Sequence, residues 1–333
     1  MSAVHLLIDL LAGRAAAQDV TPDQWPSLFA VAKAEALMGT VAEIAHDGAA
    51  HEGARALLTD QRAANVQARR LAMWEADMAR RALEPAGVRF VLMKGAAYAA
   101  ANLAIADGRQ IGDLDILVAE ADLDRTEAAL IAAGWEWVKA DAYDDHYYRT
   151  WMHELPPLIH KDRDRMIDVH HDILPRTHRA RTDAASMLTH AVAAAAGQLM
   201  LAPADRLIHC AAHCMADGDM QGGLRNLYDF HGLYRDYLAQ DGDARALMVA
   251  ARQHGLERET ARAIRLSARL YTVALPAPRL TIADHLFLRR LTARDDVGRE
   301  TGKLLGFAFY VRSHLLRMPF WMLVRHLWTK WRR

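Results

Sequence analysis

Two aspartates interrupt an apolar segment in the sequence GDLDILV, which spans residues 112–118. We expect this segment to form a β-strand, in which alternate side chains share one face. Asp113 and Asp115 would then lie on the same side, roughly 6–7 Å apart along the strand, while Leu114 and Ile116 face a core. Neighbouring carboxylates on a half-buried strand repel each other and lose hydration, so a cation between them would stabilise the arrangement. Oxygen ligands of this kind favour Mg²⁺ or Mn²⁺.

A third aspartate lies in a second apolar segment, RMIDVHH, where Ile167 and Val169 flank Asp168 and face the opposite side of the expected strand. If this strand lies beside the strand of Asp113 and Asp115, three carboxylates converge on one patch. We interpret these aspartates as candidate catalytic residues and metal ligands. Alone, the first two could equally form a turn or a helix cap at a strand end.

One histidine belongs with this second strand. His170 shares the expected face of Asp168 and could contact either the metal ligands or a substrate. The alternative is a packing or surface histidine. His171 faces the other way, and we assign it no role.

A Lys-Gly pair lies between an apolar strand-like run and a small-residue helix, in VLMKGAAYAA. Lys94 offers a point charge to a phosphate, and Gly95 allows close backbone approach at a helix start, where unpaired N–H groups attract anions. Arg109 and Gly112 precede the aspartate pair and complete the expected nucleotide-binding set. The spacing is not that of a Walker loop. Alternatively, Lys94 is a solvated strand end and Arg109 neutralises the carboxylates.

The elements that must position these residues divide the chain into four parts. Residues 1–84 show helical periodicity, with one helix expected over 26–46 and a long one that ends at Pro85. Short strands alternate with helices over 85–180, which predicts a small α/β core. Helical periodicity returns over 181–302, and residues 303–333 form a basic, aromatic tail.

The composition excludes several classes of protein. The chain has 333 residues, of which 52% are hydrophobic and 25% charged, and its formal net charge is zero, so no overall field attracts nucleic acid. Two cysteines exclude a disulfide framework. The N-terminal segment lacks a basic region and contains Asp9, and no run of about 18 apolar residues occurs, so we expect a cytoplasmic protein.

Two further segments have open interpretations. The sequence HCAAHC spaces His209 from His213, and Cys210 from Cys214, by one helical turn, but a zinc site would need other partners, so we expect packing residues. The tail carries no acidic residue after Glu300 and combines tryptophans with seven cations, and we expect Pro319 to divide it into two helices. It could lie on anionic lipid at the inner membrane surface, dock onto a partner or the acidic remainder of the chain, or pack as a terminal helix with a basic outer face.

Taken together, LMKGAAY, Arg109, GDLDILV and IDVHHDI resemble the nucleotidyltransferase-like (polymerase beta-type) superfamily, and more narrowly the bacterial family labelled "uncharacterised nucleotidyltransferase". The resemblance covers about residues 55–237. It implies an α+β fold, in which a small mixed sheet is flanked by N-terminal and C-terminal helical regions. It also implies Mg²⁺ or Mn²⁺ at Asp113, Asp115 and Asp168, with Asp168 as ligand or base, and a nucleoside triphosphate such as ATP as substrate. The superfamily's usual helix-start motif, Gly-Gly or Gly-Ser, reads Lys94-Gly95-Ala96 here, so phosphate contacts should differ in detail.

Two functions of different kinds follow. The first is an enzyme that transfers a nucleoside monophosphate to a hydroxyl of a small molecule, peptide or protein. The second is a non-catalytic binding or accessory module with the same core, acting in a biosynthetic system. A third, suggested by the tail alone, is an accessory protein at the membrane surface.

Overall fold

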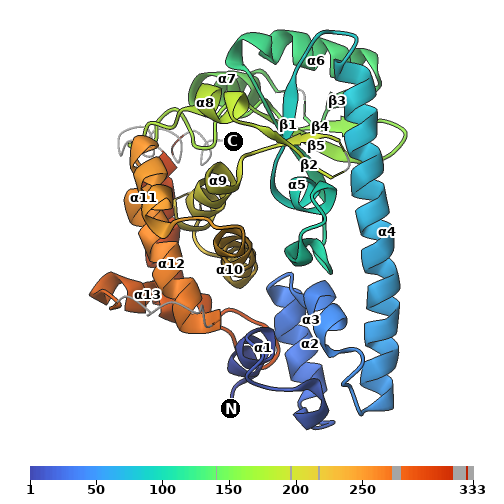
Figure 1. Ribbon diagram of the computed structural model, residues 1–333, viewed down its shortest axis with the longest axis vertical. Coiled ribbons are helices and arrows are strands. Elements are labelled where there is room, and N and C mark those ends of the chain that lie inside the picture. The colour runs from blue at the N-terminus through green and yellow to red at the C-terminus, as the bar shows by residue number, and fades with distance from the viewer. Residues whose placement is uncertain (140, 196, 217, 272–278, 318–327, 329–333) are drawn as a thin grey trace.

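The computed structural model describes residues 1–139, 141–195, 197–216, 218–271, 279–317 and 328. Within these residues, α-helices flank one mixed β-sheet (Figure 1), which confirms the expected α+β fold class.

The N-terminal region is helical and contains α1 (Ala3–Leu11), α2 (Trp25–Ala34), α3 (Met38–Ala45) and α4 (Glu52–Leu83). The single helix expected over 26–46 is wrong, because the chain breaks at Ala36, whose φ of 54° is left-handed, and α3 folds back against α2.

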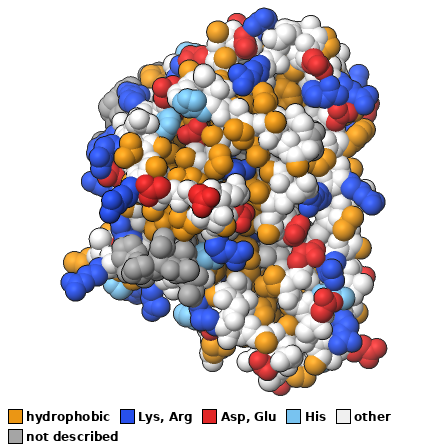
Figure 2. All heavy atoms as spheres, viewed as in Figure 1, with side chains coloured by type: hydrophobic (Ala, Val, Ile, Leu, Met, Phe, Trp, Pro, Cys, Tyr) orange, Lys and Arg blue, Asp and Glu red, His pale blue; other side chains and the backbone are white. Residues whose placement is uncertain are grey.

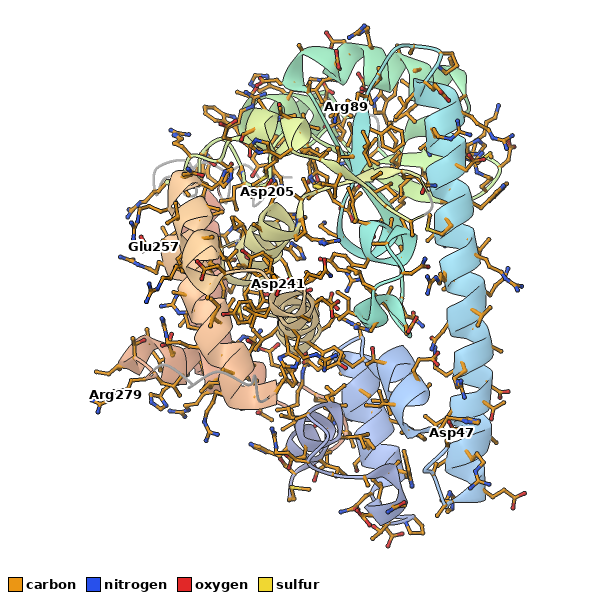
Figure 3. All side chains as sticks on the ribbon, viewed as in Figure 1. Asp47, Arg89, Asp205, Asp241, Glu257 and Arg279 are labelled. Atoms are coloured by element: carbon orange, nitrogen blue, oxygen red, sulfur yellow. The ribbon has the colours of Figure 1, made fainter. Side chains whose placement is uncertain are left out.

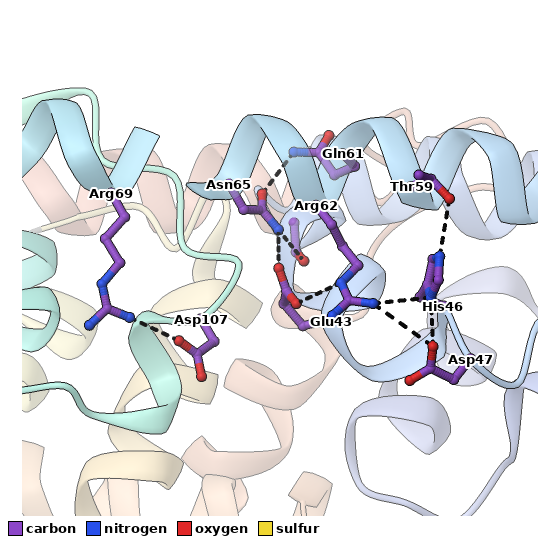
Figure 4. Close-up of polar contacts among 10 residues, drawn as sticks. Glu43, His46, Asp47, Thr59, Gln61, Arg62, Asn65, Arg69 and Asp107 are labelled. Carbon is purple, nitrogen blue, oxygen red and sulfur yellow. Dashed lines mark hydrogen bonds and ion pairs between the residues drawn. The ribbon is translucent and has the colours of Figure 1, made fainter. Parts of the chain in front are cut away.

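The long helix α4 joins the N-terminal helices to the sheet, and it contacts α3, α5, α6 and β2 (Figure 1). Its lower half is held to α3 by polar contacts: the Asn65 amide donates to the Gly39 carbonyl at 3.0 Å, and Arg62 pairs with Glu43 at 3.1 Å (Figure 4). On the face shown in Figure 2, basic and acidic side chains are interspersed along this helix. It ends before Pro85, as expected, because proline cannot continue the hydrogen-bond ladder.

The sheet has the strand order β3-β4-β5-β2-β1-β7-β6 over the described part of the chain. The strands are β1 (Phe90–Leu92), β2 (Asp113–Val118), β3 (Trp135–Trp137), β4 (Leu158–His160), β5 (Met166–His170), β6 (Val192–Ala193) and β7 (Leu199–Met200). β2–β5 and β1–β7 are parallel pairs, and the other pairs are antiparallel. The strands that carry the predicted site, β5, β2 and β1, are therefore neighbours. β6 and β7 were not predicted, since two residues each show no periodicity.

Four helices connect the strands: α5 (Lys94–Ala100), α6 (Leu123–Ala132), α7 (Ala142–Trp151) and α8 (Ala184–Thr189). α7 covers an aromatic segment for which no element was predicted. Short 3₁₀ turns lie at Ala17–Asp19, Ala104–Ala106 and Glu120–Asp122.

The C-terminal region contains α9 (Pro203–Met215), α10 (Gly223–Ala239), α11 (Ala244–Gln253), α12 (Glu257–Tyr271), α13 (Ile282–Leu291) and α14 (Lys303–Arg317). α9 is central to it, because it is buried over most of its length and contacts α10, α11 and α12. Asp205 lies at the start of α9 (Figure 3). It is 3.8 Å from His254, which follows α11.

The basic tail is described only in part. α14 exposes Leu304 and Phe307, and Trp328 is also exposed. The expected division at Pro319 lies outside the described residues, as do Trp321, Arg325, Lys330, Trp331, Arg332 and Arg333. Among the helices that are described, none combines the length and apolar character needed to cross a membrane.

Candidate active site

The three predicted aspartates meet on one face of the sheet. Asp115 and Asp168 are register partners on the parallel strands β2 and β5, and Asp113 lies two residues earlier on the same face as Asp115. One carboxylate oxygen from each lies within 4.8 Å of the others. Asp113 is exposed, whereas Asp115 is only 3% exposed, so the cluster reaches from the interior to solvent.

Asp115 has two close partners, Lys94 at the start of α5 and His170 on β5. The backbone N–H of Met93, which follows β1, donates to the Asp115 carbonyl at 3.0 Å and so places the next residue, Lys94, beside the carboxylate. Lys94 Nζ donates to Asp115 Oδ1 at 2.6 Å, and His170 Nε2 lies 3.0 Å from the same oxygen. Lys94 is not a solvated strand end. Its φ of 45° is left-handed, which is unfavourable for a residue with a side chain.

These contacts fix which groups are charged. Burial opposes ionisation of Asp115, but the Lys94 ammonium and the His170 hydrogen bond hold its pKa well below the usual range. Burial likewise opposes the charge of Lys94, yet the Asp115, Asp113 and Glu154 carboxylates raise its pKa above the ordinary value. For Asp168, burial and the negative charges of Asp115 and Glu154 act together and raise the pKa to about 7.

A fourth carboxylate, which the sequence analysis missed, lies beside this cluster. Glu154 follows α7 and forms an antiparallel β-bridge with His170. Its Oε2 lies 3.4 Å from His170 Nδ1. No motif marks Glu154 in the sequence, because it lies in a connection and reaches the site only through pairing with β5.

Arg109 contacts Asp229 and Tyr98, which lie outside the aspartate cluster. Its Nη1 donates to Asp229 on α10, and its guanidinium lies 5.5 Å from the centre of the Tyr98 ring. Its Nε is buried and has no hydrogen-bond partner. Gly95 packs against this nitrogen, since an added Cβ there would lie 2.8 Å from it. Gly112 borders open space.

α9 contributes a neutral imidazole near the cluster. His209 is 4% exposed, and burial together with the positive charge of Lys94 lowers its pKa well below the ordinary value. The thiols of Cys210 and Cys214 on this helix are buried, and burial raises the pKa of Cys214 to about 12.

The donor set of the cluster fits a hard divalent cation. Asp113, Asp115 and Asp168 offer only oxygen, and Mg²⁺ is commonly held by one or two carboxylates together with water and substrate phosphates. The excess of negative charge over the single Lys94 also favours a cation.

Residues 21–272 match the sequence model of a family described as uncharacterised nucleotidyltransferase. The chain belongs to this family. The match contains β1, β2 and β5 and therefore Lys94, Asp113, Asp115 and Asp168, so an acidic cluster compatible with a catalytic site lies within the nucleotidyltransferase region. It confirms the resemblance expected over about 55–237 and extends it in both directions. Searches of curated proteins and of solved structures find no match to the chain.

Proposed function

We propose that the chain is a metal-dependent nucleotidyltransferase that moves a nucleoside monophosphate from a nucleoside triphosphate, such as ATP, to a hydroxyl acceptor. The acceptor belongs to a small molecule, a peptide or a protein. The observation that carries the proposal is the approach of Asp113, Asp115 and Asp168 to within 4.8 Å in a member of a nucleotidyltransferase family.

Asp113, Asp115 and Asp168 would hold Mg²⁺ or Mn²⁺. When bound, the metal supplies positive charge to the triphosphate and to the entering and leaving oxygens of an in-line displacement. Asp115 is kept ionised by Lys94 and His170, so this ligand needs no proton removed before it binds a cation.

Asp168 has a second role in the proposal. In the metal-free protein the pKa of Asp168 is about 7, close to a neutral working pH, which is where a general base is most effective, so Asp168 would serve as base when it is not bound to the metal. We assign its carboxylate the task of receiving the proton of the acceptor hydroxyl.

Lys94 and Arg109 would bind the phosphates. The Lys94 ammonium has three N–H donors, and its contact with Asp115 occupies one, which leaves donors for a phosphate oxygen. Arg109 Nε is a buried donor without a partner, and a phosphate oxygen would satisfy it. The missing side chain of Gly95 lets Arg109 pack against the backbone, and Gly112 borders open space.

A second candidate is a non-catalytic module with the same core, which binds a nucleotide, peptide or partner in a biosynthetic system. The observation that favours it is the 2.6 Å ion pair of Lys94 with Asp115, which already neutralises one carboxylate of the cluster.

The test is transfer of label from α-³²P nucleoside triphosphates into acceptors of a cell extract, with release of pyrophosphate. Asp113→Asn and Asp115→Asn should each lower Mg²⁺-dependent transfer by about 10³-fold or more, because the bound charge would be lost. Asp124→Asn, on the exposed face of α6, is the matched control and should keep full activity. Undiminished transfer in either site variant contradicts the proposal, and nucleotide binding without transfer by the wild-type protein favours the second candidate.

For location we propose the cytoplasm, with residues 303–333 contacting the inner membrane surface or a partner. The exposed Leu304 and Phe307 on α14 support such a contact. Co-sedimentation of the full chain with anionic liposomes, compared with a chain that ends at residue 302, tests the membrane alternative.

A further inference from the structure

A second group of metal-binding side chains lies on the other side of His170 from the aspartate cluster. One ligand atom from each of His153, Glu154 and His170 lies within 4.8 Å of the others. We propose that these three residues bind Zn²⁺, at a site distinct from the carboxylate cluster of the nucleotidyl-transfer proposal.

The backbone holds these residues in place. Leu155 N–H donates to the Val169 carbonyl at 2.9 Å, and His171 N–H donates to the His153 carbonyl at 2.9 Å. Glu154 is therefore directly opposite His170 in an antiparallel bridge, and side chains opposite each other in such pairs lie on one face. Because the ligands come from a strand and its paired segment, they are positioned before any ion binds.

The hydrogen bonds of His170 then leave a place for a cation. Its Nε2 lies 3.0 Å from Asp115 Oδ1, and an ionised carboxylate can only accept, so Nε2 carries the hydrogen. In a neutral imidazole, Nδ1 is then an acceptor. This Nδ1 is buried without a hydrogen bond, although Glu154 Oε2, itself an acceptor, lies 3.4 Å away. Two acceptors that face each other, of which the His170 nitrogen is buried and Glu154 is partly exposed, are stabilised by a cation between them.

The donor set selects the ion. The rings of His153 and His170 lie with their centres 5.3 Å apart, and the side chains are 7% and 3% exposed. Two imidazoles and one carboxylate are a known ligand set of Zn²⁺, whereas the all-oxygen cluster suits Mg²⁺.

The Asp115 carboxylate contacts the second ring nitrogen of His170 and would not itself bind the Zn²⁺. Metal-binding histidines usually donate their second ring N–H to a carboxylate, which fixes the tautomer and the ring orientation. A metal on Nδ1 would thus keep His170 donating to Asp115, which makes His170 a positioning residue for the neighbouring cluster.

Zn²⁺ binding to the full chain tests the proposal, after removal of metals by a chelator and with excess Mg²⁺ present. We expect one Zn²⁺ per chain, bound at least tenfold more weakly by His153→Gln and by Glu154→Gln. Asp168→Asn and His190→Gln should bind Zn²⁺ as the wild-type protein does. Asp168 belongs to the all-oxygen cluster, and His190 is an exposed histidine that belongs to neither group of ligands. Co²⁺ in place of Zn²⁺ should give visible absorption that the first two variants lose.

Unchanged Zn²⁺ affinity in His153→Gln, or equal loss in Asp168→Asn, overturns the proposal. If the variants fail to fold, the ¹⁵N histidine spectrum of the wild-type protein decides. One equivalent of Zn²⁺ should shift the Nδ1 resonances of two histidines, and an unchanged spectrum means that a proton rather than a metal joins His170 to Glu154. Neither readout depends on nucleotidyl transfer, so the two proposals fail separately.

Discussion

Asp284 is fully buried and Asp168 is half-buried, and their surroundings differ in charge. Asp284, on α13, forms ion pairs with two arginines of α12. Arg262 Nε lies 3.0 Å from its Oδ1, and Arg265 Nε lies 2.6 Å from its Oδ2. These arginines and the helix cap at Thr281 outweigh burial and lower the pKa of Asp284. At Asp168, burial and neighbouring carboxylates act in the same direction and raise the pKa to about 7.

The same contrast holds more widely. Several other buried carboxylates of the described structure have arginine partners, as in the pairs Glu35–Arg294, Glu75–Arg163 and Asp229–Arg225. The sheet cluster instead shares one lysine, Lys94, among several carboxylates. Unbalanced charge of this kind lowers stability, so we interpret its presence in the sheet cluster as the mark of a site built for a ligand.

The largest loss of stability is expected at Asp284, whose negative charge is balanced by two arginines. Asp284→Asn should lower the free energy of unfolding by about 3–5 kcal/mol, because it removes the buried counter-charge of the half-buried Arg262 and Arg265. Urea denaturation measures this, with Asp124→Asn as the exposed control. A loss below about 1 kcal/mol would mean that the Asp284 ion pairs contribute no more than exposed ones, and the contrast with the sheet cluster would not hold.

A smaller change of the opposite sign is expected in the cluster. Asp168→Asn should raise the free energy of unfolding of the metal-free protein at pH 8 by about 1–2 kcal/mol, because it removes repulsion from Asp115 and Glu154. The same denaturation experiment, in the presence of a chelator, checks the sign. Destabilisation by this variant would show that Asp168 has a structural role like that of Asp284.

The advantage of Asp168→Asn should depend on pH. The folded-state pKa of Asp168, about 7, is above its ordinary value, so folding favours the protonated carboxyl. The stability from this group is complete below about pH 4 and is lost as the pH rises to 7. The difference between Asp168→Asn and the wild-type protein should therefore shrink from pH 8 to pH 4, and a constant difference would mean that another group controls the effect.

The smallest effect is expected at the exposed pairs. Arg62 contacts Glu43 and Asp47 between α4 and α3 (Figure 4), but its side chain is 41% exposed. Arg62→Ala should lower the free energy of unfolding by less than about 1 kcal/mol, and high salt should reduce the loss. A loss as large as that of Asp284→Asn would mean that exposure does not separate the two kinds of ion pair.

The sequence could predict the parts of the site that depend on local pattern. Asp113, Asp115 and Asp168 interrupt apolar runs with period two, and this alternation alone gives their face of the strand. The three carboxylates come together only because β5 pairs with β2. The sequence did not predict that pairing, so their meeting could only be stated as a condition.

The rest depended on contacts between distant segments. Arg109 and Asp229 are separated by 120 positions in the chain, so their ion pair has no local signal. Glu154 reaches the cluster through one isolated bridge, and the break between α2 and α3 lies at an alanine, Ala36, rather than at a glycine or proline.

The most direct test of the central claim, that the sheet cluster is a metal site, is the effect of Mg²⁺ on thermal unfolding of the wild-type protein and Asp168→Asn. At about 100 times its dissociation constant, Mg²⁺ should stabilise the wild-type protein by about 2.7 kcal/mol. Asp168→Asn should gain far less at the same concentration. Equal Mg²⁺ stabilisation of both proteins, or none of the wild type, would contradict the account.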